Sequence, residues 1–162
     1  MRQLARHTII IAILAGCGAA LAAGGDDVRS TREAETAADP AIQAARMKFE
    51  AKDWAGASEL LAKSIAAKPQ NADYHNLYAY AIRKGPNPNM DLVFRHYNEA
   101  LRIDPKHLGA HEYLGEAYLM QGNVAKAREH LAQLDRLCFF GCEEYTMLKK
   151  AIADYEQRQA KK

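Results

Sequence analysis

The chain has 162 residues and a formal net charge of +2, with 49% hydrophobic and 26% charged residues, which is enough apolar material for one buried core. That length accommodates a single domain together with short additional segments. A charge balance this close to zero provides no strong field to attract nucleic acid or an anionic surface, so we do not expect nucleic-acid binding.

Residues 1–23 have the layout of an export signal. Arg2 and Arg6 supply a positive start, Thr8 to Leu14 form an apolar run, and small residues follow. The apolar run is too short for a helix that spans a membrane, which needs about 20 residues. A buried N-terminal helix is the less favoured alternative. Arg2 and Arg6 are the only charged residues of this segment, so its removal leaves twenty basic and twenty acidic residues, a neutral chain.

Two cleavage chemistries fit this segment. The stretch LAGC, ending at Cys17, resembles the bacterial lipobox, in which the cysteine is lipidated and becomes the new N-terminus. The stretch ALA, ending at Ala22, suits ordinary signal peptidase, which would release a soluble protein from about Ala23. We favour lipidation at Cys17. Either route predicts an exported, periplasmic protein whose contact with the membrane is limited to a lipid on Cys17.

The remainder of the chain divides into a leader and a helical domain. Residues 24–38 are small and polar and offer no apolar stripe to bury, so they are expected to form a flexible leader. From Asp39 to Lys162, Gly and Pro are sparse and no run of β-branched residues alternates with polar ones. This pattern predicts an all-α domain.

The helical region repeats itself with a period near 36 residues. Pro69 and Pro105 are 36 residues apart, and so are His75 and His111. Small, aromatic, alanine and proline residues recur at equivalent places. They are Ala45, Ala57, Leu61 and Pro69 in the first copy, His75, Tyr78, Ala79, Ile82, Val93, Tyr97 and Pro105 in the second, and His111, Leu114, Gly115, Tyr118, Ala127 and Leu131 in the third.

This pattern resembles the tetratricopeptide repeat, and the resemblance covers Asp39 to about Phe140. It implies an α-solenoid of three helix pairs, at residues 39–71, 72–107 and 108–141. The small residues Ala45, Ala79 and Gly115 are expected where the two helices of a pair cross most closely, because a larger side chain would force the helices apart.

The chain departs from the family pattern in three places. His75 and His111 stand where tryptophan is usual, two extra residues lengthen the turn in KGPNPNMD, and Phe139 replaces a proline. We expect the two histidines to be packing residues with one ring nitrogen hydrogen-bonded. The lengthened turn is a candidate protrusion.

A further helix is predicted at residues 142–158. Tyr145, Leu148, Ile152 and Tyr155 are spaced by three, four and three residues, which makes one apolar stripe along a helix. A stacked array needs a final helix that covers its last apolar face and turns a polar side to water. We therefore predict that this helix caps the third pair.

Cys138 and Cys142 are the only cysteines that remain beyond Cys17. Outside the cytoplasm, neighbouring thiols tend to oxidise, so we expect a disulfide that fixes the capping helix to the last pair. Two reduced, buried thiols are the main alternative. A metal or redox site is less favoured, because C-x-x-x-C lacks the two-residue spacing of zinc knuckles and thioredoxin-like sites.

No pattern in the sequence indicates catalysis. It contains no nucleophile paired with a base, no glycine-rich phosphate loop and no paired catalytic carboxylates. His107 and His111 are four residues apart, but His107 lies in a turn, so a metal site there is not expected. We predict a protein that is not an enzyme and that has no metal or cofactor.

The resemblance also implies that the first helix of each pair lines the inner face of an arch, where a segment of another protein can bind. The residues predicted for this groove are Gln43, Arg46, Phe49, Asn76, Tyr80, Arg83, Lys84, Glu112, Tyr113, Glu116 and Met120. Aromatic and arginine side chains mixed with both signs of charge are typical of protein-binding surfaces. A merely solvated face is the alternative.

Some tetratricopeptide domains hold a partner's C-terminal carboxylate with lysines and asparagines on this face. The matching places here hold Leu77, Gly109 and Tyr113, so the partner need not present a free C-terminus.

Two functions from different classes therefore remain open. The first is a non-enzymatic interaction scaffold of the bacterial cell envelope that docks a partner segment in the groove. The second is a thiol-redox or metal-handling assembly factor of the envelope that uses Cys138 and Cys142.

Overall fold

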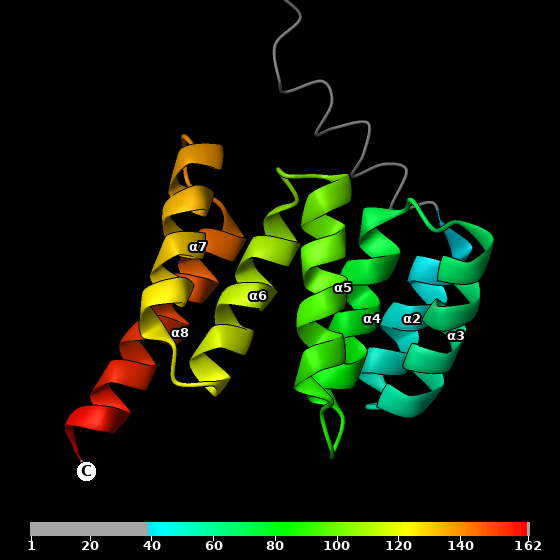
Figure 1. The fold of residues 1–162 in the computed structure, drawn as a ribbon, viewed down its shortest axis with the longest axis horizontal. Helices are drawn as coiled ribbons and strands as arrows, with labels where there is room; N and C mark the ends of the chain where they lie inside the picture. The colour runs from blue at the N-terminus through cyan, green and yellow to red at the C-terminus, as the bar shows by residue number, and fades with distance from the viewer. Residues whose placement is uncertain (1–38, 162) are drawn as a thin grey trace, which may run out of the picture.

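The computed structural model describes residues 39–161, which form seven helices and, within that range, no strand. The helices are α2 (Pro40–Glu50), α3 (Trp54–Ala67), α4 (Ala72–Lys84), α5 (Met90–Ile103), α6 (Leu108–Met120), α7 (Val124–Leu137) and α8 (Glu143–Ala160). The helix pairs stand side by side in one row, with α2 and α3 at one end and α7 and α8 at the other (Figure 1). This arrangement confirms the predicted all-α solenoid. The proposed signal segment, its Cys17 and the leader at residues 24–38 lie outside the described residues.

Side chains just before the helices satisfy backbone groups that have no partner inside the helix. Asn71, Asn89 and Asn123 accept hydrogen bonds from the N–H of Tyr74, Leu92 and Lys126 at the starts of α4, α5 and α7. Asp39 does the same at α2, where Pro40 occupies the first helical position. Each such cap stabilises a helix start by about 1 kcal/mol.

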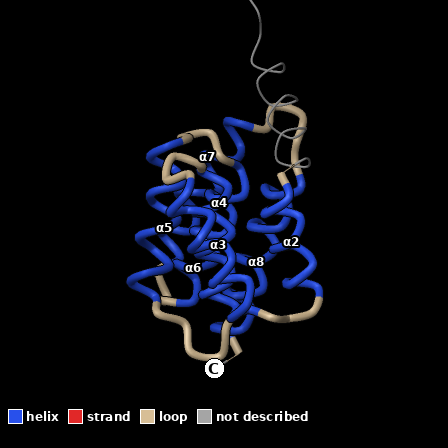
Figure 2. The backbone as a smooth tube through the Cα atoms, turned by 90° about the vertical axis from the view of Figure 1, so that its right-hand side faces the viewer, coloured by secondary structure: helices blue, strands red, loops and turns tan. Residues whose placement is uncertain are grey.

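Each hydrophobic cluster joins one helix pair to the next. The central cluster combines Ala79 of α4, Val93 and Tyr97 of α5, and Leu114 and Ala117 of α6, all of them almost completely buried. A neighbouring cluster joins α6 and α7 to α8, and another joins α2 and α3 to α4. The core is therefore a continuous series of interfaces along the row, and the view from the end of the row shows the helices behind one another (Figure 2).

The helix that packs most closely on Gly115 is α8, and not α7 as the repeat pattern predicted. A Cβ atom added to Gly115 would lie 2.6 Å from Cδ2 of Leu148, so this glycine admits α8 against α6. We expected Gly115 to face α7, its partner within the pair. The reason is that α8 takes the place of the first helix of a further pair and packs against α6 at its smallest residue.

The remaining features concern the ends of the helices. The lengthened turn between α4 and α5, residues 85–89, projects beyond the helix ends at the lower edge of Figure 1. Its Gly85 donates hydrogen bonds to the carbonyls of Ala81 and Ile82, which ends α4. None of the helices in residues 39–161 is long and apolar enough to span a membrane.

Candidate interaction face

The first helices of the three pairs lie next to one another. α2 contacts α4, α4 contacts α6, and α6 contacts α8. Side chains that point to the same side of these helices can therefore form one continuous surface. We call this surface the first-helix face and define it by Phe49, Tyr80, Arg83, Lys84, Tyr113 and Glu116, which the contacts below connect.

Aromatic rings run along this face from one helix to the next. The ring centroids of Phe49 on α2 and Tyr80 on α4 are 5.1 Å apart, and those of Tyr80 and Tyr113 on α6 are 4.8 Å apart. Trp54, at the start of α3, stacks on Phe49 at 5.8 Å and meets Tyr80 edge-on at 6.1 Å. Separations of this size are typical of favourable aromatic pairs. The rings are half-buried, so each leaves part of its surface open.

Arg83 holds two of these rings in place. Its guanidinium carbon lies 5.5 Å from the ring centre of Tyr80 and 5.7 Å from that of Tyr113, within range of cation–π attraction. Burial alone would lower the pKa of Arg83, but the charges and hydrogen bonds of Tyr97 and Glu116 raise it above its usual value. The group is therefore a permanently charged and fixed part of the face.

The hydrogen bonds of Arg83 connect three helices. Its Nε donates to the hydroxyl of Tyr97 on α5 at 3.2 Å, and its Nη2 donates to Oε2 of Glu116 on α6 at 2.7 Å. Only 6% of the Arg83 side chain is exposed, compared with 26% for Glu116. Lys84 stands beside it at the surface, with its Nζ 6.0 Å from the ring centre of Tyr80.

Glu112 lies one turn from Glu116 on α6 and is only 7% exposed. Burial raises the pKa of its carboxyl to about 8, and the negative charges of Glu116, Glu144 and Glu143 act in the same direction against the positive charge of Arg83. At neutral pH the carboxyl is mostly protonated. This end of the face, next to the start of α8, is therefore rich in acidic groups.

The predicted groove residues differ in their positions and in their exposure. Phe49, Tyr80, Arg83, Lys84, Tyr113 and Glu116 come together on the first-helix face. Gln43, Arg46 and Met120 are exposed on α2 and α6. Asn76, Arg83 and Glu112 are buried at 4%, 8% and 7% exposure, although we expected them to be open to a partner. They are buried because the neighbouring helices pack over their side chains.

Sequence reasoning missed Trp54 and Tyr97 as contributors to this face. Both belong to second helices, α3 and α5, which the repeat pattern assigns to the outer layer. Tyr97 is fully buried and reaches the face through its hydroxyl, which accepts from Arg83, and through its ring, whose centroid is 6.4 Å from that of Tyr113. The available signal was a hydroxyl-bearing tyrosine at the place where the other two copies have Leu61 and Leu131.

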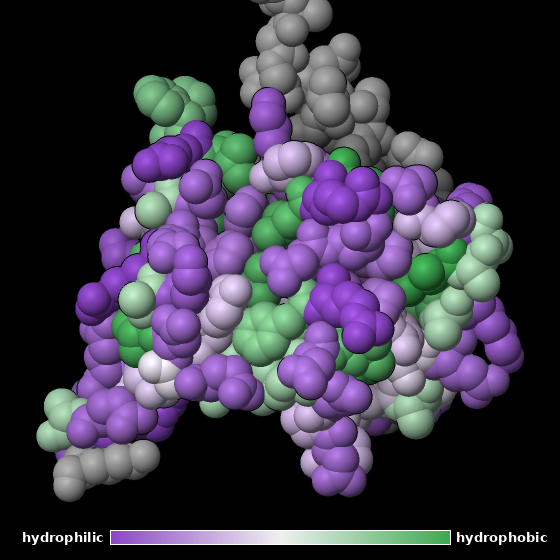
Figure 3. Space-filling model, viewed as in Figure 1, coloured by the Kyte–Doolittle hydropathy of each residue, from purple (hydrophilic) through white to green (hydrophobic). Residues whose placement is uncertain are grey.

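A disulfide closes the turn between α7 and α8. Cys138 and Cys142 are bonded, with their Cα atoms 5.6 Å apart. The two phenylalanines between them project into solvent, Phe139 at 88% and Phe140 at 97% exposure. Hydrophobic side chains accordingly form a projection at the tip of this turn (Figure 3).

The histidines form two matched pairs in consecutive repeats. Nδ1 of His75 lies 2.9 Å from Nδ1 of His96, and Nδ1 of His111 lies 3.0 Å from Nδ1 of His130. Nε2 of His75 donates to the carbonyl of Pro69, and Nε2 of His111 donates to that of Pro105. No cluster of three or more metal-ligating side chains occurs among residues 39–161.

The side chain of His107 has a different environment. Its Nδ1 accepts a hydrogen bond from the N–H of Ala110 at the start of α6, and its Nε2 lies 3.1 Å from Oδ1 of Asp73. This is a structural role at a helix start.

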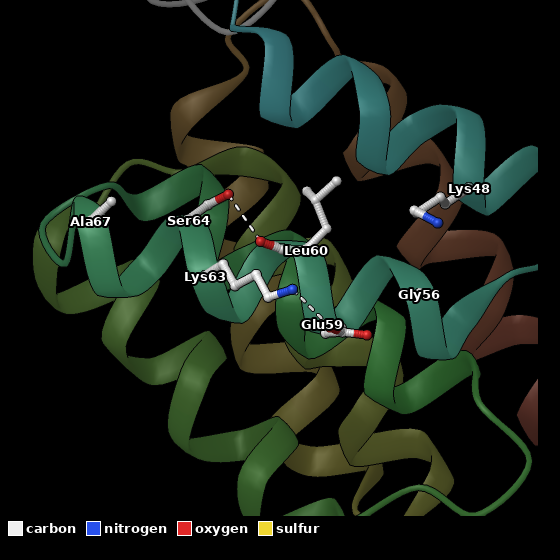
Figure 4. Close-up of a pocket in the computed structure, with 7 residues that line it drawn as sticks. All are labelled: Lys48, Gly56, Glu59, Leu60, Lys63, Ser64 and Ala67. Carbon is white, nitrogen blue, oxygen red and sulfur yellow. Dashed lines mark hydrogen bonds and ion pairs between the residues drawn. The ribbon is translucent and has the colours of Figure 1, made fainter.

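An open hollow lies beside α3 and next to Lys48 of α2. Its lining residues are Lys48, Gly56, Glu59, Leu60, Lys63, Ser64 and Ala67. Lys63 pairs with Glu59 at 2.8 Å, and Ser64 donates to the carbonyl of Leu60 at 3.0 Å; both bonds are drawn as dashed lines in Figure 4. Its polar groups bond to one another along one helix, and the hollow provides no arrangement of nucleophile and base.

Comparisons with known proteins agree with this architecture. Residues 91–152 match the family model of the tetratricopeptide repeat. The TPR repeat-containing thioredoxin TTL4 of Arabidopsis thaliana is 27% identical over 118 residues, which is 72% of this chain but 17% of that protein.

One solved structure is similar to this chain over most of the length of both. The type III secretion translocator chaperone SycD of Yersinia enterocolitica superposes with a TM-score of 0.64, covering 74% of this chain and 91% of that one. The sequence identity is 14%, so this likeness concerns the fold alone.

Proposed function

Because the chain is a tetratricopeptide repeat protein, we propose that it is a non-enzymatic interaction scaffold that binds a segment of another protein on its first-helix face. The observation that carries this proposal is the unbroken aromatic contact from Phe49 through Tyr80 to Tyr113 across three helices. Tyrosine rings and arginine supply much of the binding energy at protein interfaces, because they offer large contact areas with few rotatable bonds.

The fixed position of Arg83 supports the same proposal. Its hydrogen bonds to Tyr97 and Glu116 fix the guanidinium, which in turn holds the rings of Tyr80 and Tyr113 in place before a partner binds. A surface that is already ordered loses less conformational entropy on binding. The solved chaperone with the same fold is a translocator chaperone, which agrees with a role in binding other proteins.

We place this scaffold in the bacterial cell envelope. The support is the pattern of residues 1–23, with Cys17 in a lipobox and a second cleavage site after Ala22. Intact mass of the mature protein from its native host distinguishes a diacylglycerol on Cys17 from cleavage after Ala22. A mass that retains residues 1–23 would contradict export.

The disulfide has a structural role in this proposal. It joins the end of α7 to the start of α8, and no metal-ligating cluster accompanies it in residues 39–161. The thioredoxin named among the similar proteins adds no support for a redox function, because the match covers only 17% of that protein and the spacing here is C-x-x-x-C. Redox cycling or metal handling by Cys138 and Cys142 is thus the less favoured function.

Site-specific crosslinking in the native host tests the scaffold proposal. A photo-reactive phenylalanine analogue at Lys84, on the face, is expected to capture a defined partner, whereas the same analogue at Lys63, an exposed residue of α3, is not. Tyr80→Ala combined with Tyr113→Ala is expected to abolish the Lys84 product. Phe139→Ala combined with Phe140→Ala removes two aromatic rings elsewhere and should leave it intact. Capture that survives loss of both tyrosines would move the interface away from this face.

A further inference from the structure

The acidic end of the first-helix face contains a buried carboxyl group, that of Glu112. No hydrogen bond or ion pair reaches the Glu112 carboxyl from residues 39–161, although the residue is only 7% exposed. The nearest positive group that acts on it is Arg83, whose guanidinium already bonds to Glu116 and Tyr97. A buried carboxyl in this state is costly to retain, because buried polar groups are normally hydrogen-bonded.

A partner can reach this carboxyl from outside. Glu112 and Glu116 are four residues apart and so share one face of α6, and 26% of the Glu116 side chain remains exposed. Within the described chain, the fully enclosed polar side-chain atoms that lack a partner are Asn76 Oδ1 and His107 Nε2. The Glu112 oxygens do not belong to this set, so they are not fully enclosed. Glu143 and Glu144, in the first turn of α8, add negative charge around the same point.

We propose that the partner segment inserts an arginine or lysine side chain between α6 and the start of α8, with Glu112 as its counter-ion and Tyr113 beside it. This inference rests on the proposed function of the first-helix face. Burial makes an ion pair of this kind selective, because a neutral side chain in the same place would leave the carboxyl unpaired. Long cationic side chains suit the site, since their apolar stems pack on the tyrosine rings while the charged group reaches the carboxyl.

Binding of the cation is coupled to the loss of the Glu112 proton. In the free protein the Glu112 pKa of about 8 keeps the carboxyl mostly protonated at neutral pH. A cation binds the ionised form, so the association constant is expected to increase from about pH 6 to about pH 8, by up to roughly tenfold per pH unit. The charged groups that face Glu112 are Arg83 on α4, Glu116 on α6, and Glu143 and Glu144 on α8. Arg83 keeps its charge throughout this range.

Peptide selection provides the test. Random twelve-residue peptides displayed on phage are selected against the full mature protein, and the enriched peptides are synthesised for calorimetry. We expect them to share a basic residue near an apolar one, and we expect Glu112→Gln to weaken their binding about tenfold or more. Glu50→Gln, a matched change at the exposed end of α2, is expected to change binding less than threefold. The increase of affinity with pH should disappear in Glu112→Gln.

The outcomes separate the two proposals. Peptides that need Tyr80 and Tyr113 but lack a basic residue, or that bind Glu112→Gln as well as the wild type, overturn the cation site and leave the face intact as an interface. Peptides that bind independently of Tyr80 and Tyr113, or an absence of enriched peptides, overturn the proposed function and the cation site together. Thermal unfolding of Glu112→Gln accompanies these measurements, and its midpoint should be unchanged or higher because a buried carboxyl has been removed.

Discussion

Arg83 shows how one residue can connect three helices. It is a charged side chain at 8% exposure, and its two hydrogen bonds and two aromatic contacts come from α4, α5 and α6. The exposed pair Arg128–Glu156 has a comparable separation of 2.6 Å but lies in water. The burial of an ion pair, and not its separation, therefore determines how much it contributes to the stability of the fold.

This contrast gives a prediction at the scale of residues. Arg83→Met should lower the free energy of unfolding by about 2–4 kcal/mol, because it leaves Tyr97 and Glu116 without their partner and removes the attraction for two rings. Arg128→Met is the matched control and should cost less than about 0.5 kcal/mol. Urea titrations followed by circular dichroism measure both. Equal losses in the two variants would show that the buried pair has no special importance.

The two histidine pairs constrain the protons that they carry. A carbonyl can only accept, so Nε2 of His75 and of His111 must carry the hydrogen that bonds to Pro69 and Pro105. Their Nδ1 atoms then accept, and Nδ1 of His96 and of His130 must donate. A second proton on either pair places two N–H groups against each other.

This geometry predicts acid sensitivity. Burial lowers the pKa of His96 to about 4 and that of His130 to about 4, with the charges of His75 and His111 next in importance. Between their ordinary pKa of 6.5 and about 4 the unfolded chain binds more protons than the folded one, so stability is lost as the pH falls through this window. We expect a loss on the order of 1 kcal/mol per pair.

Glutamine variants test the cause of this loss. His96→Gln with His130→Gln keeps an N–H donor but cannot take up a proton, so the dependence of stability on pH should become flatter between pH 6.5 and 4. His107→Asn retains a helix cap outside the pairs and should follow the wild-type curve. Parallel curves for the glutamine variant and the wild type would assign the acid sensitivity to other groups.

At the scale of elements, the turn from α7 to α8 combines a covalent link with exposed phenylalanines. Cys138→Ser with Cys142→Ser should lower the free energy of unfolding by about 2 kcal/mol, since a five-residue loop restricts the unfolded chain only modestly. Capture of the partner through the analogue at Lys84 should persist. A variant of unchanged stability that has lost partner capture would favour a thiol function instead.

The phenylalanines of this turn provide its control. Phe139→Ser with Phe140→Ser changes the same segment, but the side chains are 88% and 97% exposed and bury nothing. The melting temperature should therefore stay within about 1 °C of the wild type. A large decrease would show that these rings pack against the fold in solution.

The repeat pattern was sufficient to predict the order of the helices and the all-α solenoid. Its period reflects packing that each pair repeats with the next, so the sequence contains it locally. The burial of Asn76, Arg83 and Glu112 was not predictable in this way, because it depends on side chains from helices that are distant in sequence. The contact of Gly115 with Leu148 was missed for the same reason.

At the scale of the whole molecule, each pair is stabilised mainly by its immediate neighbours. α8 covers the last apolar face with Leu148 and Ile152, which pack against Leu119, Ala127 and Leu134. In such an array stability is a sum of units and interfaces, so damage at one end need not unfold the other. We therefore expect α8 to stabilise the last helix pair more than the first.

Removal of α8 tests this view. A chain that ends at Gly141 and carries Cys138→Ser should lose hydrogen-exchange protection in α6 and α7, whose apolar surface becomes exposed, while α2 to α5 keep most of theirs. The full-length Cys138→Ser, Cys142→Ser protein is the matched control, because it lacks the disulfide but retains the helix. Hydrogen exchange followed by mass spectrometry measures protection helix by helix. Equal loss in all helices would mean that the row unfolds as one cooperative unit, and the repeats could not then be treated as separable.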